Sequence, residues 1–218
     1  MLWYKGWLET RWRLLSALAW AGFGLLPWTP EFDPNRATVL TGMFALILAG
    51  AGIVTQRSLR APAGLHGSTY FTLSLPVSRF RLLAVRAGLG WLEMIAAIAI
   101  WCGGIWILYP KAIPTAATTF ESAGVVVACA SGLYSITLLL GTFLQDQWRA
   151  WGSGIVFAAL WWLSHHTRLP ASANIFRAMG DGLPLVTHTM PWAAMAFSLE
   201  LAAILFFAAL TVVQLREY

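Results

Sequence analysis

Two acidic residues lie well inside long apolar stretches of this sequence: Glu93 and Glu200. A charged side chain inside a membrane costs several kcal/mol unless it is paired or hydrated, so both are functional candidates. One interpretation is a proton or cation path, or contact with a basic substrate. The other is structural, with each carboxyl group bonding a neighbouring helix or lining a dimer contact. Both interpretations stay open.

Three histidines fall within one polar stretch, at His165, His166 and His188. Adjacent histidine side chains usually point in different directions, and no cysteine or acid is suitably spaced to complete a ligand set. The sequence therefore predicts no metal site.

Motifs of hydrolytic enzymes and of nucleotide binding are missing from the sequence. There is no Gly-x-Ser-x-Gly, no His-Glu-x-x-His and no Gly-x-x-x-x-Gly-Lys-Ser/Thr. Lys5 and Lys111 are the only lysines, and neither ends a phosphate-binding loop. We expect no catalytic residue and no cofactor in this chain, and no ATP hydrolysis through a P-loop.

The composition excludes a soluble globular protein. Of 218 residues, 59% are hydrophobic and 11% are charged, whereas soluble domains carry roughly a quarter charged residues. The net charge of +5 comes from basic residues beside apolar spans. They indicate anionic lipid headgroups rather than nucleic acid as the partner.

The apolar stretches predict an all-α integral membrane protein that forms one transmembrane domain over 1–218. An amphipathic helix in the interface is expected at the N-terminus, where Trp3, Trp7 and Trp12 alternate with charged residues. Six spans follow, at about 14–28, 38–54, 82–109, 122–144, 150–164 and 191–215.

Six spans place both termini on the same side of the membrane. One side then carries Lys5, Arg11, Arg13, Arg57, Arg60, Arg79, Arg81, Arg86, Arg149 and Arg216, and the other carries Arg36, Lys111, Arg168 and Arg177. The side richer in Lys and Arg is usually cytoplasmic, so we expect both termini in the cytoplasm.

Two local patterns give finer predictions. Gly124, Ala128 and Gly132 recur at every fourth position, a close-packing stripe of small residues. In the polar connection before the last span, Ser172 is predicted to cap a short helix.

The stretch 67–86 differs from both the spans and the plain loops. A half-apolar run leads to a Pro-Val-Ser-Arg corner, and Arg79, Arg81 and Arg86 then enter the third span. One interpretation is an interfacial loop whose arginines reach the headgroups. The other is a cytoplasmic helix that binds a partner protein.

The order of residues here resembles the membrane subunits of ABC-2 type exporters. Three parts of the sequence are similar to that family. They are the run Phe71-Thr-Leu-Ser-Leu-Pro-Val-Ser-Arg79, the basic and small residues Arg86-Ala-Gly88 and Gly90, and the start Trp3-Tyr-Lys-Gly-Trp-Leu-Glu9. The family's acidic residue early in the segment is missing, since 65–68 reads Leu-His-Gly-Ser.

The resemblance implies a permease half of an exporter in the bacterial inner membrane. Its partners would be an ABC ATPase subunit, which carries ATP and Mg, and a second permease half, either the same chain or a related one. The segment between spans two and three would be the coupling helix, with contacts from Tyr70, Phe71, Leu75, Pro76, Ser78, Arg79 and Arg81. The alternative function is a secondary transporter or channel that uses Glu93 and Glu200.

Overall fold

The described part of the chain is built from helices. The computed structural model describes residues 7, 11, 14–19, 22, 42–45, 48, 78–108, 115–144, 146–167 and 169–215, and no strand occurs among them. The helices are α4 (Arg79–Leu108), α5 (Ala116–Phe143), α6 (Asp146–His166), α7 (Ile175–Met179), α8 (Pro184–Thr187) and α9 (Trp192–Leu215). Three of them, α4, α5 and α9, are long and apolar enough to cross a membrane, which indicates a membrane protein.

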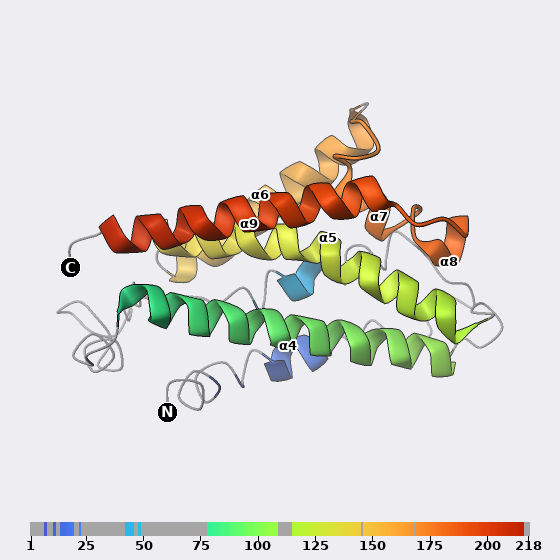
Figure 1. Ribbon diagram of the computed structural model, residues 1–218, viewed down its shortest axis with the longest axis horizontal. Helices are drawn as coiled ribbons and strands as arrows, with labels where there is room; N and C mark the ends of the chain where they lie inside the picture. Colours follow the sequence, from blue (N-terminus) through green and yellow to red (C-terminus); the bar gives the residue numbers. More distant parts are fainter. Residues whose placement is uncertain are drawn as a thin grey trace.

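Helix α5 lies at the centre of the arrangement (Figure 1). It runs antiparallel to α4, with which it is joined by a short connection, and parallel to α9, its most extensive neighbour. It also contacts α6 and the short helices α7 and α8. Figure 1 therefore shows three long helices side by side, with α5 between α4 and α9.

Polar side chains set several helix ends. The hydroxyl of Thr115 accepts a hydrogen bond from the backbone N–H of Thr118 at 3.3 Å and caps α5. Before α7 the capping residue is Asn174, whose Oδ1 accepts from the N–H of Arg177 at 3.0 Å. The prediction that Ser172 caps this helix was wrong, because the asparagine nearest the first helical turn satisfies the free N–H group.

The predicted third, fourth and sixth spans fall on α4, α5 and α9. The first two of these helices start earlier than predicted, because the polar turns after Ser78 and Thr115 are helical although they are not apolar. The predicted span 150–164 lies within α6, which begins four residues earlier, at Asp146. Helix α6 is not among the three candidate membrane-spanning helices found in the described residues.

The N-terminal predictions fall mostly outside the described residues. Residues 14–19 are helical within the predicted span 14–28, as are 42–45 and 48 within the predicted span 38–54. Of the predicted interfacial helix, Trp7 and Arg11 are described, and both are helical.

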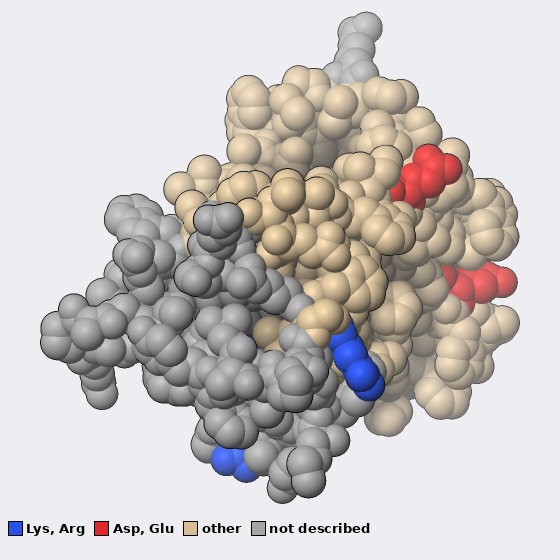
Figure 2. Space-filling model, turned by 60° about the vertical axis from the view of Figure 1, so that its left-hand side comes forward, with Lys and Arg blue, Asp and Glu red and all other residues tan. Residues whose placement is uncertain are grey.

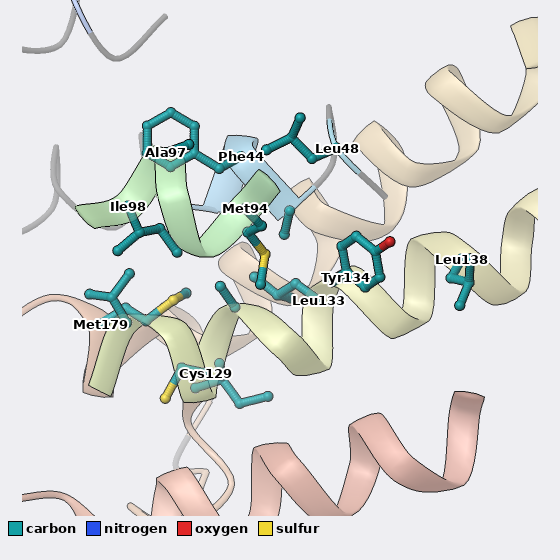
Figure 3. Packing of buried hydrophobic residues seen from close by; sticks show 14 of the residues in the cluster. Phe44, Leu48, Met94, Ala97, Ile98, Cys129, Leu133, Tyr134, Leu138 and Met179 are labelled. Carbon is teal, nitrogen blue, oxygen red and sulfur yellow. The ribbon is translucent and has the colours of Figure 1, made fainter. Parts of the chain in front are cut away.

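Buried apolar side chains from α4, α5, α7 and α9 form the core, together with residues that precede these helices in the chain. Figure 3 shows Met94 and Ile98 of α4 beside Leu133 of α5, with Phe44 and Leu48 packed against the same cluster. Each of these side chains is almost completely buried. Phe44 and Leu48 therefore belong to the same core as α4.

Gly90 lies at a close approach between these elements. A Cβ atom at this position would lie 2.6 Å from the carbonyl oxygen of Leu48 and 2.6 Å from the hydroxyl of Tyr134. No side chain fits there without displacing backbone, so the packing of residue 48 and α5 onto α4 requires glycine.

Candidate functional site

A groove of about 300 Å³ lies between the three long helices. Its lining comes from Ala84, Ala87, Gly88 and Trp91 on α4, Ser131, Tyr134 and Ser135 on α5, and Leu199, Ala202, Ala203 and Phe206 on α9. Small side chains on α4 and α9 leave the hollow, since alanine and glycine do not fill the space between neighbouring helices.

Three polar side chains of the groove, those of Trp91, Ser131 and Tyr134, are hydrogen-bonded within the chain. The indole N–H of Trp91 donates to Ser131 Oγ at 2.9 Å, and that hydroxyl donates to the Val127 carbonyl at 2.7 Å. The hydroxyl of Tyr134 donates to the Ala87 carbonyl at 2.7 Å. The Trp91–Ser131 and Tyr134–Ala87 bonds tie α4 to α5. With these donors engaged, the groove presents mainly carbon atoms to an occupant, beside the hydroxyl of Ser135.

The two intramembrane acids lie at similar depths but face different surroundings. Ser198 of α9 bonds the carbonyl of Cys129, and Trp91 of α4 bonds Ser131. The two contacts lie two residues apart on α5. Glu200 follows Ser198 by two residues and Glu93 follows Trp91 by two, so the depths of the two acids along the bundle differ by no more than about one helical turn. Glu93 is buried, with 6% of its surface exposed, and interacts within the chain. Glu200 is exposed.

Neither acid lines the groove. Glu93 and Glu200 therefore lie at a similar depth, as one ion path would require, but they share no cavity among the described residues. Each acid has its own setting, one inside the helix packing and one on the outer surface of α9.

The end of the predicted coupling segment is the N-terminal cap of α4. The backbone N–H of Arg81 donates to Ser78 Oγ at 3.3 Å, and the N–H of Leu82 donates to the Ser78 carbonyl at 3.1 Å. Helix α4 begins at Arg79, and the side chain of Arg81 is exposed. The other predicted contact residues, Tyr70, Phe71, Leu75 and Pro76, lie outside the described residues.

The histidines of the last connection interact with their own helix. His165 and His166 place Nδ1 at 2.8 Å and 3.0 Å from the carbonyls of Trp161 and Trp162, and their rings lie against those indoles. Within the described ranges, no three His, Cys, Asp or Glu side chains come together as a metal-binding group.

Sequence reasoning did not identify the groove. Its signal was present as small residues at Ala84, Ala87 and Gly88 and again at Ala202 and Ala203. The same pattern is typical of tight helix contacts. Here the small residues of α4 and α9 instead line a hollow beside α5. Comparison of the chain with protein-family models, with curated proteins and with solved structures finds no match.

Proposed function

We propose that this chain is the membrane-spanning subunit of an ATP-driven exporter of the ABC-2 type, working with a separate nucleotide-binding subunit. The sequence run 71–79 motivates the assignment, and the cap at Ser78 is the observation that supports it best. ATP and Mg would be bound by the partner ATPase, since this chain has no phosphate-binding loop.

The cap supports the proposal because the described end of the segment, from Ser78 to Arg81, is itself the start of α4. Ser78 bonds the first turn of α4, and α4 is tied to α5 by the Tyr134–Ala87 and Trp91–Ser131 hydrogen bonds. A displacement of the segment by a partner would therefore move α4 as a rigid rod. The groove lies along that same part of α4, so its width would change with the motion.

Purification with a co-expressed candidate ATPase tests the proposal. We expect the wild-type chain to bring down a P-loop ATPase in mild detergent and to stimulate its ATP hydrolysis in nanodiscs. Phe71→Asp and Arg79→Glu should leave the chain inserted and folded while reducing that stimulation about tenfold. Arg177→Glu, a matched charge reversal on α7, should retain it.

Normal stimulation in both segment variants would contradict the coupling role. Failure of any ATPase to co-purify or to cross-link through residues 67–81 would remove the exporter assignment itself.

The similar depth of Glu93 and Glu200 supports the alternative, a secondary transporter or channel. That function predicts gradient-driven flux in liposomes that contain this chain alone, with loss of flux in Glu93→Gln or Glu200→Gln. The exporter proposal predicts no such flux.

A further inference from the structure

Arg81 lies in line with the groove on the surface of α4. It precedes Ala84 by three residues, Gly88 by seven and Trp91 by ten, and this spacing places all four on one face of the helix. Arg81 is exposed and makes no ion pair among the described residues. Arg86, the next cation along α4, points to a different side and interacts within the chain.

The surface at this end of the molecule can be seen in Figure 2, which brings forward the side where α4 begins and α9 ends. A basic side chain lies at the edge of the tan surface formed by residues without charge, and the acidic side chains in view lie apart from it. The described surface here therefore places positive charge beside uncharged residues.

The length of α4 places Arg81 near the level of lipid phosphates. The candidate span Phe80–Ile107 has 28 residues and is about 42 Å long at a rise of 1.5 Å per residue. That length matches a bilayer including its headgroup regions, about 40–45 Å, rather than the hydrocarbon core of about 30 Å. Arg81 is in the first turn of this span, whereas Trp91 lies about 15 Å further in, within hydrocarbon.

The inside of the groove suits a hydrocarbon chain. Trp91 and Ser131 close its deep end, and their mutual hydrogen bond leaves the indole N–H unavailable to a ligand. The volume of about 300 Å³ is at the lower end of small-molecule sites, which span roughly 300–1,000 Å³. A second transmembrane helix, about 10 Å across with its side chains, could cover the opening but not enter it.

We propose that this groove binds one acyl chain of an anionic membrane lipid whose phosphate pairs with Arg81. The guanidinium would hold the phosphate through charge-assisted, bidentate hydrogen bonds. The chain would lie along Ala84 and Gly88 against Ala203 of α9 and end at Trp91. This site needs no ATPase, and its test is separate from ATPase stimulation. It assigns Arg81 to a lipid phosphate instead of to the ATPase contact that the resemblance implies.

Photolabelling of the purified chain in nanodiscs tests the site. The probe is a phosphatidylglycerol carrying a photoreactive group on one acyl chain, in a phosphatidylcholine bilayer. We expect labelled peptides from α4 and α9. Unlabelled phosphatidylglycerol should compete several-fold better than phosphatidylcholine, and millimolar inorganic phosphate should not compete, because a free phosphate lacks the chain.

Two variants separate the headgroup contact from the chain contact. Ala203→Trp fills the groove and should reduce labelling at least fivefold, and Ala84→Phe provides a second way to fill it from the opposite wall. Arg81→Gln should bring the preference for phosphatidylglycerol over phosphatidylcholine close to one while labelling persists. Ala96→Trp, on an exposed part of α4 away from the groove, and Arg177→Gln are the size and charge controls, with thermal melting as the check of folding.

Three results would overturn the proposal. Equal competition by the two lipids in the wild type would exclude anion recognition. Unchanged labelling in folded Ala203→Trp and Ala84→Phe would place the lipid elsewhere. Efficient disulfide cross-linking of Ala203→Cys between two copies in native membranes would show that protein, not lipid, covers the groove.

Discussion

Helices α5 and α9 have similar apolar composition but opposite surroundings. Of the most apolar stretch of α5, 67% is buried inside the molecule, whereas only 22% of the corresponding stretch of α9 is buried. α5 contacts α4, α6, α7, α8 and α9, whereas α9 packs chiefly on α5 along one side. Because lipid tails are as apolar as leucine, composition alone does not distinguish a helix inside the bundle from one at its edge.

The difference teaches where this molecule's own stability lies and where it is open to other molecules. α5 is held by contacts within the chain. The outward side of α9, with Ile204 and Phe207 largely exposed, is left to lipid or to another chain. The predictions below test this contrast between an inner and an edge helix.

The largest effect is expected where the two helices touch most closely. A Cβ atom at Gly132 of α5 would lie 2.5 Å from Ser198 Oγ and 3.3 Å from the Ser198 carbonyl oxygen. Gly132→Val should therefore force α9 away from α5 and lower the free energy of unfolding by about 3 kcal/mol, at the upper end for overpacked cores. Denaturant or thermal unfolding in detergent measures the loss.

Gly124 is the matched control in the same stripe of small residues. A Cβ atom there would meet nothing within 4 Å, so Gly124→Val should leave stability within about 0.5 kcal/mol of wild type. The predicted stripe Gly124–Ala128–Gly132 is thus a tight helix contact at Gly132 but not at Gly124. Equal destabilisation by both valines would contradict the contrast between the two positions.

The two intramembrane acids should differ next. Glu93 is buried and interacts within the chain, so Glu93→Ala should cost about 2 kcal/mol, because it leaves a void inside the helix packing. Glu200 is exposed on α9, and Glu200→Ala should be neutral or stabilising in detergent. Melting curves of both variants decide; a larger loss for Glu200→Ala would mean that another chain covers this face.

The smallest effect is expected at the hydrogen bond between α5 and α9. Ser198 Oγ donates to the Cys129 carbonyl at 2.9 Å, in a fully buried contact. Ser198→Ala should cost about 0.6 kcal/mol, the average for hydrogen bonds between helices in membranes. Thr211→Ala removes a bond from an exposed hydroxyl to its own helix and serves as the control, with a smaller change expected in the same unfolding assay.

Much of the helical layout could be predicted because it depends on local sequence. The apolar runs around Ile98, Val126 and Leu205 are long enough for helices that cross a membrane, whatever surrounds them. Helices α4 and α5 begin before the predicted spans, because an apolar run does not include the polar first turn that Ser78 or Thr115 caps. The capping residue of α7 was predicted at the wrong position because Ser172 and Asn174 are both good capping residues, and the sequence does not show which of them precedes the first helical turn.

The candidate site was beyond sequence reasoning because it depends on which helix faces are adjacent. Ala84 and Ala203 are far apart in the chain, and both patterns of small residues are equally typical of tight helix packing. The prediction that both acids are functional likewise could not separate Glu93, inside the packing, from Glu200, outside it.

The sequence by itself determined the chemical class of the molecule: an all-helical, apolar chain with a basic segment leading into α4, since hydrophobicity and charge are properties of the residues themselves. Only the tertiary structure decided that α5 is central, that α9 is at the edge, and that a groove in line with Arg81 lies between α4 and α9. Those features depend on the separation and rotation of neighbouring helices. In a membrane, burial against protein and exposure to lipid select the same apolar side chains. The sequence alone therefore shows little of which helix faces pack on protein and which face lipid.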